Sequence, residues 1–333
     1  MNRRRALGTI GAVFAGTIRT SFAAERDARV ALLMFDQEAE DREWTDALVK
    51  GFAASGYRQG DNLRLQRFEV PVVGDRSWDT TVPNAIARMM PTEPECIIAT
   101  GEVLCRYLQQ AGGTTPVVTD VGDPVGLGLA ATLLRPGGKF TGLHRGYAEV
   151  ATKQIQLLRT ITPQLRGLVW IAFKPQLVWL PTFETAARQA GLPVRKIVPP
   201  IPTDQGFHEY LRSEFAALRR EGFLAGHFHT GIPAFIDAVT ALALEHRIAL
   251  SYSGGDPDRE GLLLSYGIKR LEGLRSARRI PAIVARILRG ERPGDIPFEG
   301  PTGYTLSLNL KTAARIGLAV PSEVLVLADE IIR

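Results

Sequence analysis

Short apolar runs alternate with amphipathic stretches along most of this chain. The run at 29–35 (RVALLMF) is almost wholly apolar, as in strands that are buried on both faces. The stretch at 42–55 carries apolar residues at helical spacing, and Gly56 follows it as a stop signal. Strands separated by helices predict βαβ units, parallel sheets and right-handed crossovers.

The alternation predicts two successive blocks, 29–142 and 144–256, and a C-terminal segment. In the first block we expect strands at 29–35, 63–70, 95–100 and 116–121, and helices at 42–55, 79–90, 102–111 and, briefly, after Pro124. In the second block we expect strands at 168–173, 194–198, 223–229 and 248–252, and helices at 148–160, 182–190, 207–220 and 232–246.

The junction and the C-terminal segment have their own pattern. Segment 135–142 predicts a turn followed by a short connecting strand. After Tyr266 a helical stretch runs to Gly290, and Pro281 is expected to kink or interrupt it. A strand at 304–309 and two short helices complete the chain.

Open parallel sheets bind ligands at the carboxyl ends of their strands, and this rule selects the loops of interest. The residues at those predicted ends are Phe35, Asp36, Thr100, Gly101, Glu102, Asp123, Pro124, Lys174, Phe228, His229 and Tyr252. We expect two facing blocks to enclose them in one cleft.

The first 23 residues have a different character. A basic stretch is followed by an apolar run from Ala6 to Ile18 and then by Ser21-Phe22-Ala23, which predicts a signal peptide (1–23) that is cleaved near Ala23 and a periplasmic location. The 23 residues hold four of the 40 Lys and Arg but none of the 35 Asp and Glu, so most of the net charge of +5 lies there. The near-neutral remainder argues against a nucleic-acid partner.

Chemical motifs are few, and each has a plainer interpretation. His227 and His229 share one face of a strand end, but no further ligands are spaced for a metal, so we expect neither a metal nor a cofactor. The segment 122–128 lacks the GxGxxG order of phosphate loops, and 251–255 lacks the GxSxG nucleophile elbow. We assign no catalytic residue. Cys96 and Cys105 are expected to be buried free thiols, although a disulfide between them stays open.

Longer strings carry a family resemblance. The segments 121–143, 261–267 and 307–332, together with GFAASGYRQGDNL at 51–63, resemble the substrate-binding proteins of ABC importers in the TrpX-like family. The resemblance implies a type I periplasmic-binding fold: α/β, with two three-layer Rossmann-like lobes whose parallel sheets are joined by a three-segment hinge. The implied crossovers lie near 140–143, 262–266 and 299–304. The implied division is 24–142 plus 266–300 for lobe 1 and 143–265 plus 301–333 for lobe 2.

The resemblance also implies where the ligand sits. The family's cleft loops fall on Thr100-Gly101, Asp123-Pro124, Thr141-Gly142 and Ser265-Tyr266. Backbone N–H groups and hydroxyls there can hold a carboxylate, although Asp123 can equally cap a helix after Pro124.

The chain departs from the family pattern at four places, and these bear on specificity. They are Glu102, Lys174-Pro175, His227-Phe228-His229 and Ser251-Tyr252-Ser253-Gly254. Phe35, Phe228, Tyr252 and Tyr266 can sandwich an apolar ligand side chain, or they can belong to the core.

The resemblance implies a periplasmic component of an ABC importer. We expect it to capture a small carboxylate or amino-acid-like solute by hinge closure, to work with an ABC permease and ATPase, and to be a monomer. A ligand-sensing periplasmic module that feeds a signalling partner stays open as an alternative. An enzyme on the same fold is the less favoured alternative.

Overall fold

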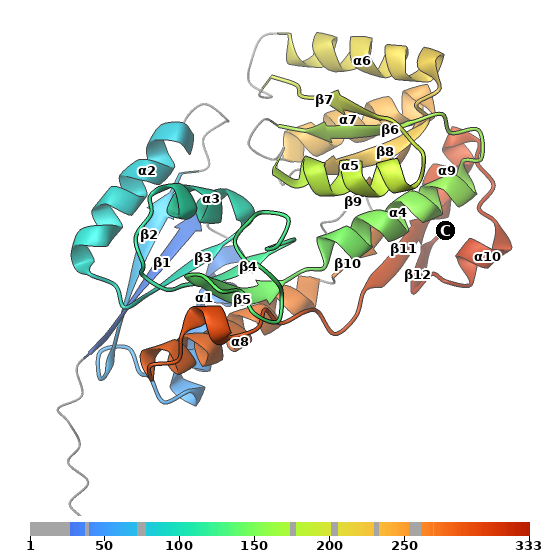
Figure 1. Cartoon of the computed structure of the whole chain (residues 1–333). Helices are drawn as coiled ribbons and strands as arrows, with labels where there is room; N and C mark the ends of the chain where they lie inside the picture. The colour runs from blue at the N-terminus through green and yellow to red at the C-terminus, as the bar shows by residue number, and fades with distance from the viewer. Residues whose placement is uncertain are drawn as a thin grey trace, which may run out of the picture.

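The computed structural model describes residues 27–36, 40–71, 78–173, 178–200, 206–229, 233–252, 261–268 and 270–333. These residues form two α/β lobes that lie next to each other, each built on its own sheet (Figure 1). The predicted signal peptide and its cleavage site lie outside the described residues. The predicted fold class is confirmed: two lobes, each with helices on both faces of a largely parallel sheet.

The first lobe contains a sheet with the strand order β2-β1-β3-β4-β5, in which every pairing is parallel. Its elements are β1 (Ala28–Phe35), α1 (Glu40–Ala54), β2 (Leu63–Val70), α2 (Trp78–Met89), β3 (Cys96–Thr100), α3 (Glu102–Gln110), β4 (Val117–Val121), β5 (Phe140–His144) and α8 (Arg270–Leu288). Helix α8 therefore comes from a distant part of the sequence.

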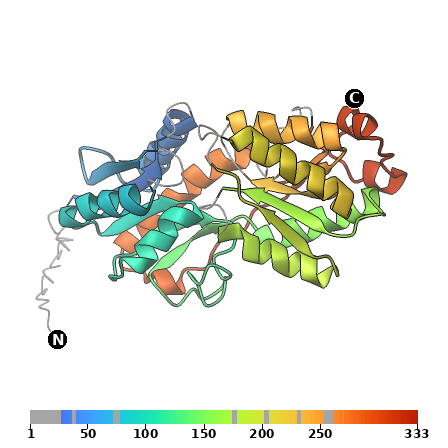
Figure 2. The same cartoon turned by 90° about the horizontal axis from the view of Figure 1, so that it is seen from above.

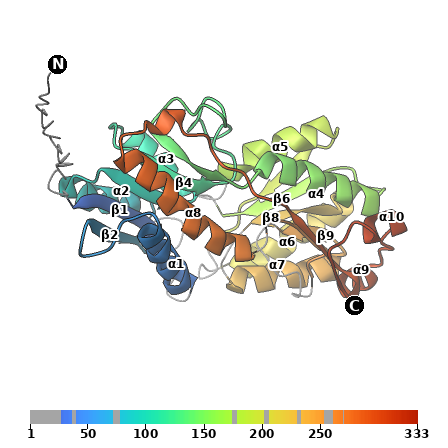
Figure 3. The same ribbon diagram turned by 90° about the horizontal axis from the view of Figure 1, so that it is seen from below.

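The apolar runs of the first block form strands because both faces of the sheet are covered. Along β1, Leu33 points into a core with α2 and α3, whereas Leu32 points into a core with α1 and α8. Figure 3 shows α1 and α8 side by side on the underside of this lobe. The lobe therefore has three layers.

The second lobe contains a sheet with the strand order β12-β11-β10-β9-β8-β6-β7. Its elements are α4 (Tyr147–Ile161), β6 (Leu168–Ala172), α5 (Leu180–Gln189), β7 (Val194–Ile197), α6 (Phe207–Glu221), β8 (Ala225–His229), α7 (Pro233–His246), β9 (Ala249–Tyr252), β10 (Leu264–Gly267), β11 (Thr305–Asn309), α9 (Leu310–Ile316), α10 (Ser322–Leu325) and β12 (Glu330–Ile332).

The layers of the second lobe repeat the arrangement of the first. Trp170 of β6 packs with α4, α5 and α9, and its neighbour Val169 packs with α6 and α7 on the opposite face. Figure 2 shows the gold α6 and the orange α7 beside each other on one side of this lobe. The C-terminus lies at the end of the second lobe that is remote from the first (Figures 2 and 3).

Four local expectations are corrected. β10 and β11 pair antiparallel, because the chain leaves the second lobe along β10 and returns into it along β11. The short strand β12 was not predicted. The segment after Pro124 forms consecutive turns rather than a helix, and Gly126 and Gly128 lie within it. Pro281 does not interrupt the helical stretch, because α8 is continuous from Arg270 to Leu288.

The chain passes between the sheets after His144, after Gly267 and before Thr305. The first and third passages run together, because Glu299 donates its N–H to the Gly142 carbonyl (2.9 Å) and accepts the N–H of His144 (3.0 Å). The second and third passages meet through the rings of Tyr266 and Tyr304, whose centroids are 5.6 Å apart. Backbone pairing and a ring contact thus connect the passages.

Candidate functional site

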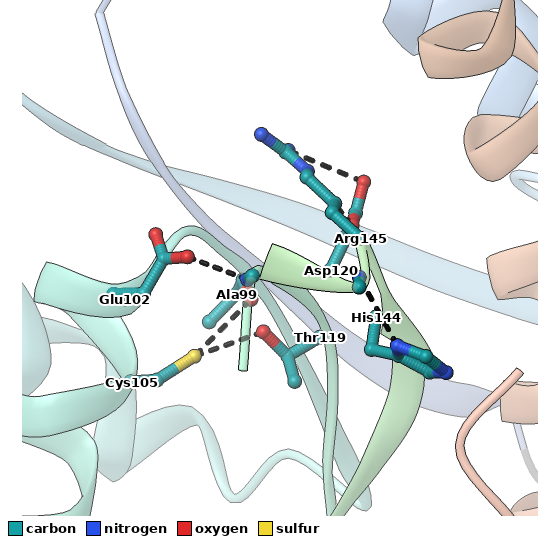
Figure 4. Close-up of polar contacts among 9 residues, drawn as sticks. Ala99, Glu102, Cys105, Thr119, Asp120, His144 and Arg145 are labelled. Carbon is teal, nitrogen blue, oxygen red and sulfur yellow. Dashed lines mark hydrogen bonds and ion pairs between the residues drawn. The ribbon is translucent and has the colours of Figure 1, made fainter. Parts of the chain in front are cut away.

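The carboxyl ends of β3, β4 and β5 bring together the richest polar cluster of the first lobe (Figure 4). β3 leads directly into α3, whose first residue is Glu102, and β4 leads into the loop that contains Gly122 and Asp123. β5 ends at His144, and Arg145 follows it. Parallel pairing places all three ends at one edge of the sheet, which is the edge where such folds bind ligands.

Glu102 connects two of these loops. Its carboxylate Oε1 accepts the N–H of Gly122 at 2.6 Å, and the residue is only 4 % exposed. The carbonyl of Gly122 in turn accepts the N–H of Tyr147 at 3.0 Å, and Tyr147 begins the first helix of the second lobe. Gly122 therefore links α3 of the first lobe to α4 of the second.

Asp120 and Arg145 form an ion pair at the same edge. The Arg145 guanidinium donates from Nε and Nη2 to the two Asp120 oxygens, at 3.1 and 3.3 Å. The charge of Asp120 raises the pKa of Arg145 above its ordinary value, and the Glu102 carboxylate adds to this effect while burial opposes it. The Arg145 side chain is half exposed, whereas that of Asp120 is almost buried. The pair thus presents a fixed cation to the exterior.

His144 is a neutral acceptor beside this pair. Its Nδ1 accepts the N–H of Gly146 at 3.2 Å. Burial lowers the pKa of His144, and this outweighs the attraction of a proton to Glu149, Asp123 and Asp120. A ring that accepts through Nδ1 carries its proton on Nε2.

Asp123 bridges the lobes. Its Oδ1 accepts the N–H of Gly126 at 2.8 Å, which stabilises the turn after β4. Its Oδ2 accepts the hydroxyl proton of Thr182, on α5 of the second lobe, at 3.2 Å. The expected capping role of Asp123 therefore applies to a turn, and its second oxygen contacts the opposite lobe.

A buried hydrogen-bonded chain lies on the second-lobe side. His227 is fully buried between the rings of Trp170 (5.0 Å) and Phe183 (5.9 Å). Its Nδ1 is 3.0 Å from the Ser251 hydroxyl and its Nε2 is 3.4 Å from the Tyr147 hydroxyl. These contacts indicate a structural role for His227.

Below the edge, the two cysteines are buried and free, as expected. The thiol of Cys105 contacts the Thr119 hydroxyl at 2.9 Å (Figure 4). Burial raises the pKa values of Cys96 and Cys105 to about 12, so neither is a reactive thiolate at neutral pH.

The aromatic candidates pack on other aromatic rings. Phe35 lies 4.7 Å from the ring of Trp78 in the first lobe. In the second lobe the fully buried Phe228 stacks on Tyr252 at 4.9 Å. Tyr266 contacts Tyr304, and its carbonyl accepts a hydrogen bond from Gln154 (2.9 Å). Each of these rings has a packing role, and the structure does not bring the four together.

The remaining predicted residues fall into three groups. Thr100 and Gly101 lie at the edge, and Gly101 has the positive φ of 92° with which α3 begins. Asp36 is exposed and directly follows β1, the strand that pairs with β3. Pro124 and Thr141 are buried, and the Thr141 hydroxyl donates to the Ile296 carbonyl (2.7 Å). Lys174 and the side chain of His229 lie outside the described residues.

Sequence reasoning missed Arg145, Thr182 and Tyr147. The strand-end rule would have found Arg145 if the segment at 140–144 had been recognised as a full sheet strand. Thr182 lies within the first turn of a helix in the other lobe, and no sequence pattern connects it to Asp123.

Three broader observations concern the described part of the chain. It contains no group of three or more His, Cys, Asp or Glu side chains placed to hold a metal ion. None of its helices is long and apolar enough to cross a membrane. A hollow lies at the start of α6, and it is lined by Gly206, Phe207, His208, Glu209 and Arg212 rather than by predicted site residues.

Two three-layer lobes, connected by several chain passages and with polar strand ends between them, define a bilobal solute-binding fold. A family model for ABC transporter substrate binding proteins matches residues 30–196 and 228–332, which include parts of both lobes and most of the chain. The chain belongs to this family of ABC transporter substrate-binding proteins. Members of this family typically work outside the cytoplasm.

Solved structures agree with the fold. The chain is similar to an ABC domain from Streptococcus pneumonia in complex with L-Trp (TM-score 0.68, 19 % identity, covering 92 % of this chain and 100 % of that one). It is also similar to a conserved domain protein from Vibrio cholerae (TM-score 0.68, 18 % identity, 92 % and 100 % covered). A ligand-free, open substrate binding protein with adhesive properties from Clostridium difficile matches with a TM-score of 0.59 at 16 % identity (91 % and 99 % covered). No curated protein matches the chain.

Proposed function

We propose that this chain is the solute-capturing component of an ABC importer and that its ligand is a small amino-acid-like molecule bound between the lobes. The observation that carries the ligand class is the presence of both charges at one sheet edge: the half-exposed Arg145 guanidinium and the Glu102 and Asp123 carboxylates. A zwitterion needs such a pair of complementary charges. The L-Trp complex of a structurally similar domain supports the same class.

Capture proceeds by rotation of the lobes about the chain passages, which closes the strand ends over the solute. The Asp123–Thr182 hydrogen bond and the Gly122–Tyr147 backbone bond supply contacts across the boundary. We propose that the closed form docks as a monomer on an ABC permease and its ATPase from the periplasm. No catalytic step is part of this function.

A thermal-shift screen of the twenty amino acids tests the ligand class. A ligand present at 100 times its Kd stabilises the folded protein by about 2.7 kcal/mol, which raises the melting temperature measurably. Mass spectrometry of protein purified without refolding identifies any solute that remains bound. Absence of a shift with every amino acid at millimolar concentration rejects the amino-acid class, and binding of a sugar instead retains the binding role with another ligand.

The importer role has a separate test. Deletion of the gene from its host should abolish uptake of the identified solute, and the gene encoding the full chain should restore it. Normal uptake after deletion, combined with loss of a transcriptional response to the solute, would favour the sensing role.

A further inference from the structure

We infer that Glu102 recognises a positively charged hydrogen-bond donor, such as an ammonium group, on the ligand. The inference rests on the proposed function, because it assumes that a solute binds at this edge. It assigns a specificity role to a residue whose position the family resemblance left unexplained.

The first observation is that only one of the two Glu102 carboxylate oxygens accepts a hydrogen bond from a described residue. Oε1 accepts the Gly122 N–H at 2.6 Å, but Oε2 has no hydrogen-bond partner among the described residues. The residue is 4 % exposed, so it has lost most of its contact with water. Oε2 still has some contact with solvent, because it is not one of the described side-chain atoms that are both fully buried and without a hydrogen-bond partner. A donor that arrives from outside can therefore reach Oε2 and hydrogen-bond to it.

The second observation concerns the start of α3. Backbone N–H groups and the helix dipole at this position favour a negative charge. Glu102 lies in the first turn and supplies that charge from the chain itself. Its Oε1 also accepts the N–H of Gly122, so this donor is not available to an incoming group. The edge that the sequence suggested for a ligand carboxylate therefore already holds a carboxylate.

The third observation is the balance of charge around Glu102. In the described loops 100–102, 120–123 and 144–146, the charged side chains are three carboxylates and one guanidinium. Arg145 is held by Asp120 through two hydrogen bonds, which leaves the negative charges of Glu102 and Asp123 in excess. Such an excess attracts a cation and repels an anion.

Glu102→Gln tests the recognition of the ligand without removing the structural contact of residue 102. The amide oxygen of Gln can still accept the Gly122 N–H, so the contact between α3 and the loop after β4 is retained while the charge is lost. Glu323→Gln makes the same chemical change at an exposed position on α10 of the second lobe and serves as the matched control. The melting temperature of each unliganded variant reports any structural effect.

The probes are two matched sets of compounds. One is L-tryptophan with tryptamine and indole-3-propionate, and the other is L-leucine with isopentylamine and 4-methylpentanoate. Calorimetry with the wild-type protein should show that at least one amino acid and its amine bind, and that the acid analogue binds at least about tenfold more weakly. Glu102→Gln should weaken the amino acid and the amine by about tenfold or more and should leave the acid unchanged or improved. Glu323→Gln should bind all compounds as the wild type does.

Two results overturn the inference alone. One is equal or tighter wild-type binding of the acid analogues, and the other is unchanged amine affinity in a folded Glu102→Gln protein. If that variant does not fold, the relative affinities of the wild-type protein for the amine and the acid analogues still test the inference. Failure of every compound to bind the wild type overturns this inference for both side-chain types, whereas the amino-acid class itself is rejected only if the screen of all twenty amino acids also gives no shift.

Discussion

At the scale of the residue, the candidate site consists of polar side chains that are each held in place by at least one hydrogen bond. Glu102 is held by the Gly122 N–H, Arg145 by Asp120, and Asp123 by the turn that it caps. The sequence predicted Glu102 and Asp123, because strand ends and helix starts can be located from the apolar pattern. It did not predict their partners, because hydrogen bonds between loops depend on how the strands are ordered in the sheet.

His144 gives a prediction at this scale. Its pKa is lowered from the ordinary 6.5 by burial, so the folded protein binds the proton less readily than the unfolded chain. The stability that this provides is complete above pH 6.5 and is lost as the pH falls through the folded pKa. In His144→Asn a neutral amide replaces the ring, so the melting temperature should fall less than in the wild type between pH 7.5 and pH 5.

The measurement is a series of thermal melts of both proteins across that range at constant ionic strength. His208→Asn, on α6 at a distance from the chain passages, is the control and should follow the wild-type curve. Parallel curves for His144→Asn and the wild type would contradict the prediction.

At the scale of the element, the apolar pattern predicted where the strands and helices lie, but it did not predict which of them pack against each other. The predicted strand at 63–70 is the observed β2, and most other boundaries agree within two residues. Helices α1 and α8 were both predicted, but their packing against each other, across more than 200 residues of sequence, was not. The missed β12 has only three residues, too few to establish an alternating pattern.

Packing of α1 against α8 depends on Gly51. A Cβ at this position would lie 2.8 Å from Cγ of Pro281 and 3.1 Å from the Arg278 carbonyl oxygen. Gly51→Ala should therefore force the two helices apart and destabilise the protein by about 1–3 kcal/mol. Urea denaturation followed by circular dichroism measures the change.

The control is Gly303→Ala, since a Cβ at Gly303 meets nothing within 4 Å. That variant should be close to neutral. A Gly51→Ala protein that is as stable as the wild type would show that the helix pair can relax at no cost.

At the scale of the whole molecule, the two lobes form because apolar residues alternate between two faces in every central strand, and each face needs a covering helix layer. The antiparallel β10–β11 pair follows from the chain leaving and re-entering the second lobe side by side. Asp123 and Thr182 are among the described residues through which the two lobes contact each other.

Thr182→Val tests that contact. Valine has nearly the same shape but cannot donate to Asp123, so the lobes should separate more easily. Loss of one such hydrogen bond costs about 0.5–1.5 kcal/mol, which corresponds to about a two- to tenfold weaker affinity for the ligand found in the screen. Small-angle scattering of the unliganded protein should give a larger radius of gyration.

Thr185→Val, on the same helix, removes a hydroxyl that donates to the Pro181 carbonyl within α5, and it should change neither quantity. Unchanged scattering and affinity in Thr182→Val would mean that the Asp123 contact does not influence closure.

The order of strands and helices, the bilobal α/β class and the loops of the candidate site follow from the amino-acid sequence alone. These features can be predicted from local hydrophobic periodicity, from the positions of glycine and proline, and from sequence strings that are specific to the family. Three contacts are apparent only in the folded molecule: Glu102 with Gly122, Asp120 with Arg145, and Thr182 with Asp123 across the lobes. Such contacts join residues from different strand ends or lobes, and their distances depend on strand order and lobe placement, which no local pattern encodes.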